Sequence, residues 1–291
     1  MIFLPQENVW ECAGFLAKPR CHHTAVFLAN TLYIIGGFRN GSSLWIEDIC
    51  AEVLSFNHAN RRWKMKPSMN HDRAFHSSVI VDSKIFVIGG RNSFGDILSS
   101  VEVFIEEDNS WQECQSLPYP VLSAAVTVIG NFIYIFGGIT IGENSEIIST
   151  HTLVFDPKLN SWFFGAELQI PCACSGAANF LNHAFLLGGL IEERDNLQSI
   201  QEILQLDIFS QTWSELGKLS VPRHSPVTVQ IGSNIYVIGG FSTQEDKAVA
   251  ICEVLNISDG TVTPIAPLPH PISGMAGIIL PSTITISEKV L

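Results

Sequence analysis

Short runs of consecutive apolar residues recur along the chain, and each run ends at a pair of glycines. The run before the second pair is Ile85-Phe86-Val87-Ile88. A continuous apolar run rich in β-branched and aromatic residues is typical of a strand that is covered on both faces. The five pairs are Gly36-Gly37, Gly89-Gly90, Gly137-Gly138, Gly188-Gly189 and Gly239-Gly240, spaced 53, 48, 51 and 51 residues apart.

Tryptophan recurs in step with the glycine pairs. Five tryptophans each precede the next pair by 26 residues, whereas the distance from a pair to the following tryptophan varies as 27, 22, 25 and 25. Surface loops accept insertions that packed strands resist, so the pattern predicts a packed half and a half with one free loop. We expect the glycines and tryptophans to serve packing. The tryptophans are Trp10, Trp63, Trp111, Trp162 and Trp213.

The second repeat predicts four strands, which we call a, b, c and d, at residues 75–81, 84–88, 101–105 and 110–114. Blades stacked around an axis would cover both faces of such apolar strands. The sequence therefore predicts one all-β domain over residues 1–291, a six-bladed β-propeller with four antiparallel strands per blade. The expected blades are 19–67, 72–118, 120–168, 171–219 and 222–269, with a composite blade from 270–291 and 1–15.

The two ends of the chain predict how the ring closes. Residues 2–10 have the pattern of strands c and d, and residues 275–280 and 283–287 stand in the slots of strands a and b. A last blade shared by both termini would remove exposed edge strands. Glu288 and Lys289 stand where the sixth glycine pair should be, so we expect this blade to be the least regular.

A glycine pair after strand b, a tryptophan on strand d and a repeat of about 50 residues resemble the Kelch family over essentially the whole chain. Residues 100–104 and 109–111, with Arg73 opening strand a, are similar to the BTB-Kelch substrate adaptors. The resemblance implies a non-catalytic protein-interaction domain that recognises substrates for a cullin-type ubiquitin ligase, bound through a domain not present here. Two alternatives stay open: a sugar-processing enzyme of the sialate-epimerase kind, and an actin-associated scaffold.

The variable connections between strands b and c share one face of the disc with the starts of the a strands, because antiparallel neighbours alternate in direction. We expect a protein or peptide partner to bind this face. Three repeats open strand a with an arginine: Arg20, Arg73 and Arg223. BTB-Kelch proteins that bind acidic peptides use arginines in this slot, so the resemblance implies that these three point toward a central mouth.

The resemblance places two further sets of residues on the same face. Those after the glycine pairs include Phe38, Arg91 and Phe241, and we assign Glu52, Ser100, Glu202 and Glu253 to the slot before strand c. If the glutamates pair with the arginines, an acidic peptide loses its attraction. If they splay outward, the arginines offer bidentate sites for a carboxylate.

The charge of the chain limits its partners. It carries 16 basic and 28 acidic residues, a formal net charge of −12. Proteins that bind nucleic acids or anionic membranes gather Lys and Arg, so we expect neither partner. No apolar run reaches the roughly 18 residues of a membrane helix, and no signal-peptide pattern opens the chain. Seven scattered cysteines predict reduced thiols in the cytoplasm.

The sequence contains no clear catalytic or metal-binding motif. Cys172-Ala173-Cys174 is too short for a zinc-binding pair and has no second pair to match it. Copper oxidases of this fold need tyrosine and histidine ligands outside the repeat, whereas Tyr33, Tyr134 and Tyr236 lie inside b strands and only Tyr119 lies outside them. No Ser/His/Asp order and no phosphate-binding glycine loop stands out. We expect no catalytic residue, no metal and no cofactor.

Overall fold

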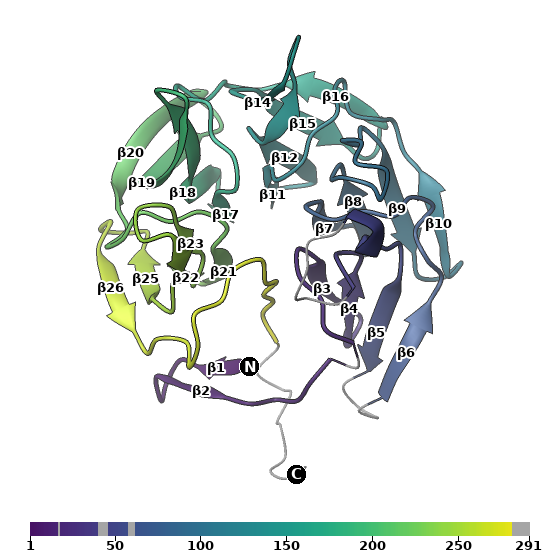
Figure 1. Ribbon diagram of the computed structural model, residues 1–291, viewed down its shortest axis with the longest axis horizontal. Helices are drawn as coiled ribbons and strands as arrows, with labels where there is room; N and C mark the ends of the chain where they lie inside the picture. The colour runs from purple at the N-terminus through teal and green to yellow at the C-terminus, as the bar shows by residue number, and fades with distance from the viewer. Residues whose placement is uncertain (17, 40–45, 58–61, 281–291) are drawn as a thin grey trace.

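The computed structural model describes residues 1–16, 18–39, 46–57 and 62–280. These residues form a ring of antiparallel sheets around a common centre (Figure 1). Five sheets have four strands each and follow one another around the ring. In every one of them the first strand along the chain is innermost and the last is outermost (Figure 1). The predicted all-β propeller with four antiparallel strands per blade is confirmed.

The strand bounds of the five blades are as follows. The first blade contains β3 (Thr24–Leu28), β4 (Thr31–Ile35), β5 (Val53–Asn57) and β6 (Arg62–Lys66). The second contains β7 (Ser77–Val81), β8 (Lys84–Ile88), β9 (Val101–Ile105) and β10 (Ser110–Glu113). The third contains β11 (Ala125–Ile129), β12 (Phe132–Phe136), β15 (Thr152–Asp156) and β16 (Ser161–Phe164). The fourth contains β17 (Gly176–Phe180), β18 (His183–Glu193), β19 (Asn196–Asp207) and β20 (Thr212–Lys218). The fifth contains β21 (Val227–Ile231), β22 (Asn234–Ile238), β25 (Cys252–Asn256) and β26 (Val262–Ile265).

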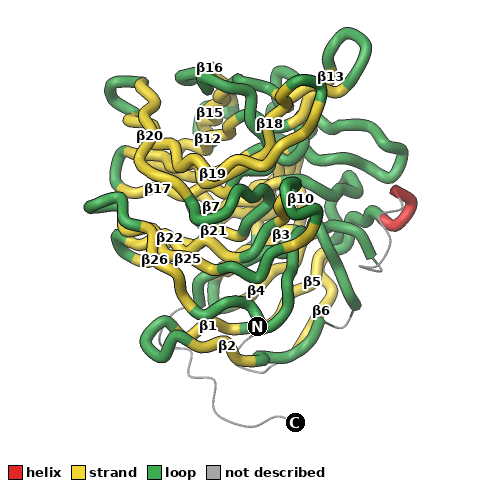
Figure 2. The backbone as a smooth tube through the Cα atoms, turned by 60° about the vertical axis from the view of Figure 1, so that its left-hand side comes forward, coloured by secondary structure: helices red, strands yellow, loops and turns green. Residues whose placement is uncertain are grey.

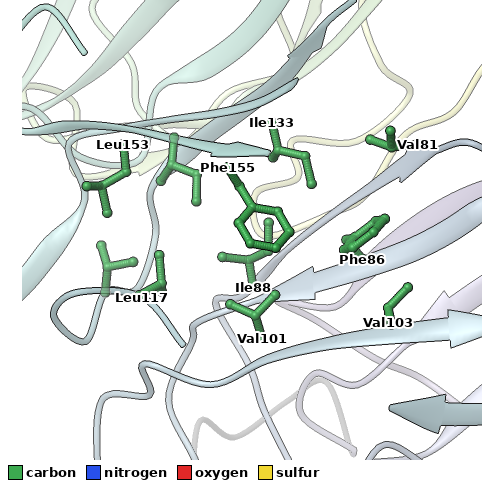
Figure 3. Close-up of a cluster of buried hydrophobic side chains, with 11 residues drawn as sticks. Val81, Phe86, Ile88, Val101, Val103, Leu117, Ile133, Leu153 and Phe155 are labelled. Atoms are coloured by element: carbon green, nitrogen blue, oxygen red, sulfur yellow. The ribbon is translucent and has the colours of Figure 1, made fainter. Parts of the chain in front are cut away.

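Apolar side chains fill the spaces between neighbouring blades. Phe86 of β8 and Phe155 of β15 meet edge to face, with ring centroids 6.1 Å apart. Figure 3 shows both rings among side chains from the second and third blades, with Ile88 and Ile133 beside them. Each b strand is thus covered by a neighbouring blade, which is why its sequence is continuously apolar.

The tryptophans on the outermost strands join each blade to the one before it. The indole N–H of Trp111 donates to the carbonyl of Pro67, which follows the first blade, at 2.9 Å. Trp162 donates in the same way to Gln115 at 2.9 Å, and Trp213 repeats the bond one blade further at 3.1 Å. At each of these junctions the indole therefore packs its apolar ring against the neighbouring blade and its N–H donates a hydrogen bond to that blade.

The glycine pairs lie where one blade meets the start of the next. The amide of Gly138 donates to the carbonyl oxygen of Cys172 at 2.9 Å. Gly137 has a φ of 58°, and a Cβ built on it would stand 1.9 Å from the same oxygen. Only glycine combines this conformation with so close an approach. At all five pairs, the second glycine makes the same bond to the residue that stands sixteen positions before the next glycine pair or, for the fifth pair, to Ile272 in the corresponding slot.

Main-chain hydrogen bonds also link six chain segments near the centre of the ring. Each segment supplies one residue with a left-handed φ: His22, Phe75, Ser123, Cys174, Ser225 and Gly274. The amides of His22 and of the four residues from Phe75 around to Ser225 each donate to a carbonyl of the preceding segment, at 2.6–3.2 Å. His22 donates to Gly274 at 2.8 Å, so the first and last segments of the ring meet there.

The sixth sector of the ring differs from the prediction, because the structure has five four-stranded blades and not six. β1 (Ile2–Leu4) and β2 (Val9–Glu11) form a two-stranded sheet between β26 and the first blade (Figure 1). The indole of Trp10 donates to the carbonyl of Ala266 at 2.9 Å. Residues 270–280 contain no strand, and the predicted strand at 283–287 lies outside the described residues. The expected sheet shared by both termini is absent from the described part of the chain.

Residues 275–280 pack against the inner strand of the fifth blade without pairing in a sheet. Gly277 lies so close to β21 that a Cβ on it would stand 2.2 Å from Cγ1 of Val227. Glycine also weakens a strand. Met275 packs into the cluster around Trp10 and Val227. This segment therefore closes the ring by packing and by the bond from His22 to Gly274, rather than by joining a sheet.

Candidate functional site

The connections between strands b and c form one face of the disc, which we call the loop face. It comprises residues 36–39, 46–52, 89–100, 137–151, 188–201 and 239–251. The turns between strands a and b and between c and d form the opposite face, which we call the turn face. It includes residues 82–83, 106–109, 130–131, 157–160, 181–182, 208–211 and 232–233.

The three predicted arginines are buried and paired within their own blades. The side chains of Arg20, Arg73 and Arg223 are all 0% exposed. Arg73 bonds Oε1 of Glu102 at 2.6 Å and donates to the carbonyl of Gly89 at 2.7 Å. Burial lowers the pKa of Arg73, and the negative charge of Glu102 opposes this shift. The guanidinium thus holds the start of strand a to the end of strand b and the start of strand c.

The other two arginines are held in the same way. Arg20 pairs with Glu52 and donates to the carbonyl of Gly36 at 3.0 Å. Arg223 pairs with Glu253 and donates to the carbonyl of Ile251, in the connection between β22 and β25 of the same blade, at 3.0 Å. Of the two arrangements left open by the sequence, the structure shows internal pairing. In this arrangement none of the three guanidinium groups reaches a ligand on the surface.

Glu102 is one of the three glutamates that pair with the buried arginines, and the sequence analysis did not select it. Glu102 lies within β9 nine residues before Trp111, and Glu253 lies within β25 nine residues before Val262. Glu253 is therefore equivalent to Glu102 and not to Ser100, so the assigned slot is wrong by two residues. The signal was present in the sequence, because Val262 marks the tryptophan slot of that repeat.

Two candidates before strand c make other contacts. The hydroxyl of Ser100 accepts a hydrogen bond from Arg73 at 2.9 Å, inside the second blade. Glu202 accepts from Nζ of Lys218 at 3.1 Å on the outermost strand of the fourth blade. Among the described residues, neither Ser100 nor Glu202 contacts an arginine of another blade.

The candidates after the glycine pairs are spread over three blades. Phe38 is buried against Ile49 and Ala74. Phe241 is half-buried in β23 (Phe241–Ser242), which pairs with β24 (Lys247–Ala248). Arg91 is partly exposed and pairs with Glu146 on the next blade. Of these three, only Arg91 offers a charged group to the loop face.

Two hairpins stand out on the loop face. In the third blade, β13 (Ile139–Ile141) pairs with β14 (Glu146–Ile148), and Figure 2 shows this hairpin projecting from the body. In the fourth blade, β18 and β19 continue past the glycine pair to a two-residue turn at Arg194 and Asp195, both with positive φ. Two successive residues with positive φ give a turn whose twist matches that of the paired strands. Main-chain hydrogen bonds between the paired strands order each of the two connections.

A pocket of about 300 Å³ lies between these hairpins. Its lining residues are Ile147, Ile148, Pro171, Glu192, Arg194 and Asp195. Sequence reasoning did not select any of them. The two segments lie in the variable half of the repeat, where no position recurs and only a fold can show which loops become neighbours.

Large apolar side chains are also exposed on the turn face. They include Leu159, Leu181 and Phe209, in the third and fourth blades. Exposed apolar side chains are available for contact with other proteins. Both faces of the disc therefore carry candidate contact residues.

Buried and partly buried titratable groups line the start of the a strands near the centre. Burial, and then the charge of His224, lower the pKa of His22 to about 4. Burial, followed by the charges of Arg20 and His22, lowers the pKa of His23 to about 4. Burial raises the pKa of Cys172 to about 11. These histidines are neutral and this thiol is protonated at neutral pH.

All seven cysteines are free thiols. Within the described ranges, no three His, Cys, Asp or Glu side chains gather in a way that could hold a metal ion. Of the helices in the described part of the chain, none has the length and apolar character needed to cross a membrane.

Comparison with known proteins agrees with the fold. Residues 3–250 match the family described as Attractin/LZTR1 β-propeller. Alpha-scruin of Limulus polyphemus is 28% identical over 282 residues, and beta-scruin of the same organism is 29% identical over 286. Kelch-like protein 26 of Danio rerio is 24% identical over 273 residues. A solved structure described as "Structure of YjhT" has a TM-score of 0.74 at 15% identity, covering 89% of this chain and 87% of the other.

The chain is much shorter than its curated relatives. The matched regions are 95% of this chain but 31% of alpha-scruin, 96% of this chain but 31% of beta-scruin, and 91% of this chain but 44% of Kelch-like protein 26. The similarity therefore concerns the propeller and leaves most of each relative unmatched.

Proposed function

Since the chain belongs to the Attractin/LZTR1 β-propeller family, we propose that it is a protein-interaction domain that binds its partner on the loop face. One observation carries this proposal. Two ordered hairpins in adjacent blades hold exposed apolar and charged side chains around a pocket. The ring beneath them is held by main-chain hydrogen bonds, and a preorganised surface loses little conformational entropy on binding.

Within that role, the domain recognises substrates for a cullin-type ubiquitin ligase. The similarity to Kelch-like proteins 26, 40 and 25 supports this assignment. In such an adaptor a separate domain, not present in this chain, would bind the ligase. The seven free thiols suit a reducing compartment, so we place this role in the cytoplasm.

A second candidate is an actin-associated scaffold. Exposed apolar side chains on both faces favour it, because a scaffold must contact two partners at once. Cosedimentation with actin filaments distinguishes the two roles. A scaffold pellets with filaments, and a substrate adaptor stays in the supernatant.

Affinity capture with matched variants tests the proposed function. Ile147→Asp/Leu197→Asp changes the loop face, and Leu181→Asp/Phe209→Asp places the same charges on the turn face. All four positions are exposed, so we expect melting temperatures close to that of the unchanged protein. The proposal expects captured proteins to be lost from the loop-face variant alone. Identical captured proteins from both variants and the unchanged chain would remove the loop face as the binding site.

A further inference from the structure

The two hairpins that flank the pocket are strongly acidic. The connections at 137–151 and 188–201 carry the exposed carboxylates Glu143, Glu146, Glu192, Glu193 and Asp195 against one basic residue, Arg194. Only Glu146 is shown in an ion pair, with Arg91 of the second blade. Even with this pair formed, three of the remaining four carboxylates are left without a compensating charge in these connections.

Acidic and apolar side chains share the same surface of the β18–β19 hairpin. Glu192 stands directly opposite Leu197 in the register of the two strands, so their side chains lie on one face of the hairpin. Leu197 is 55% exposed, and Ile147 across the pocket is 46% exposed. Glu192, Asp195 and Ile147 all line the pocket. A ligand seated there would meet carboxylates and apolar carbon together.

We propose that this pocket binds a short segment of a partner protein that carries a Lys or Arg next to an apolar side chain. This rests on the proposed function and names its ligand class. The apolar side chain packs against Ile147, Ile148 and Pro171, and the cation lies between Glu192 and Asp195. A volume of about 300 Å³ is at the lower limit of small-molecule sites, so it suits one or two side chains rather than a folded surface.

Charge decides between a basic and an acidic segment. The buried arginines are neutralised inside their blades, while the hairpins keep unpaired carboxylates at the surface. Two carboxylates, Glu192 and Asp195, outnumber the one cation that lines the pocket, Arg194. An acidic segment is therefore disfavoured both here and by a chain whose net charge is −12. The acidic peptide implied by the Kelch resemblance therefore does not fit this pocket.

Selection from a random octapeptide library displayed on phage tests the ligand class. The proposal expects selected peptides to be enriched in Lys and Arg beside Leu, Ile or Phe. A synthetic copy of the most enriched peptide is then titrated by fluorescence anisotropy. Glu192→Lys/Asp195→Lys should weaken its affinity about tenfold or more, and raising the salt from 50 to 300 mM should weaken binding to the unchanged protein.

A matched control makes the same charge change on the turn face. Glu107→Lys/Asp108→Lys replaces two exposed carboxylates in the turn between β9 and β10 and should leave affinity within about twofold. Selected peptides that are acidic, yet bind the unchanged protein and lose affinity to Ile147→Asp, would overturn the ligand class while leaving the proposed function intact. The pocket would be excluded as the binding site if the selected peptides bound Glu192→Lys/Asp195→Lys and Ile147→Asp as tightly as the unchanged protein. It would also be excluded if no peptide were selected at all.

Discussion

The buried arginines are the residues whose role differs most from the sequence expectation. Arg73 and Glu102 are both 0% exposed and bonded at 2.6 Å. Removing one partner of such a pair leaves an uncompensated charge in a low-dielectric interior. We expect Arg73→Ala to lower the free energy of unfolding by about 3–5 kcal/mol, measured by urea denaturation.

Arg91 provides the matched control for Arg73. Its pair with Glu146 is partly exposed to solvent, and exposed pairs contribute at most about 1 kcal/mol. Arg91→Ala should therefore change stability little. If Arg73→Ala were as mild as Arg91→Ala, the buried pair would not be holding the blade together.

Two partly buried histidines predict acid sensitivity. The pKa values of His22 and His23 lie at about 4 in the fold, below the ordinary value of about 6.5. Between about pH 4 and pH 6.5 the unfolded chain binds more protons than the folded protein does. The free energy of unfolding therefore falls as the pH is lowered from 6.5. Each histidine contributes up to about 1.4 kcal/mol per pH unit. Urea midpoints at pH 7, 6 and 5 measure the slope.

The double variant His22→Gln/His23→Gln isolates this effect. Glutamine does not titrate, so the loss of stability between pH 6.5 and pH 5 should become shallower. An unchanged slope in the variant would show that other groups cause the acid sensitivity.

At the scale of elements, the glycine pairs can be tested against an ordinary turn glycine. Gly137 and Gly130 have nearly the same φ, 58° and 60°, but a Cβ on Gly130 meets no atom within 4 Å. Alanine at either site costs about 1–2 kcal/mol for its backbone conformation. Gly137→Ala must also displace the carbonyl of Cys172, so we expect at least a further 1–3 kcal/mol, measured by urea denaturation.

The control value comes from Gly130→Ala in the same experiment. Equal losses for the two alanine variants would mean that the junction between the third and fourth blades adjusts freely. Close packing of that junction would then be contradicted.

Strands were predictable and loop hairpins were not. The expected strands at 84–88 and 101–105 coincide with β8 and β9. The expected strand a at 75–81 begins two residues later, at Ser77, because Phe75 has a left-handed φ of 56° and bonds to His22 in the central ring. The β13–β14 hairpin is short and exposed, so no buried apolar pattern marks it.

At the scale of the whole molecule, repeat spacing predicted a ring but misjudged its last sector. All five repeats that have a glycine pair became four-stranded blades, including the fifth, in which Val262 stands in the tryptophan slot. Residues 275–280 hold the expected slots, yet Gly277 presses against β21 instead of pairing in a sheet. The partners of the arginines also depend on the fold, since Glu102 and Arg73 are 29 residues apart in sequence.

Closure of the ring depends on the N-terminal hairpin. Trp10 bonds to Ala266 and packs in the cluster that contains Val227 and Met275. Trp10→Ala should destabilise this sector by roughly 2–4 kcal/mol. Hydrogen exchange should then accelerate in β1, β2 and residues 270–280 and stay unchanged in β8 and β9. Uniform acceleration across all blades would contradict a locally closed sector.

Site-specific photo-crosslinking tests most directly the claim that a partner docks on the loop face. A photoreactive side chain replaces Ile147 on the loop face in one variant and Leu181 on the turn face in another, both at exposed positions. The account predicts that the partner is crosslinked from position 147 and not from position 181. Crosslinks from position 181 with none from position 147 would contradict it.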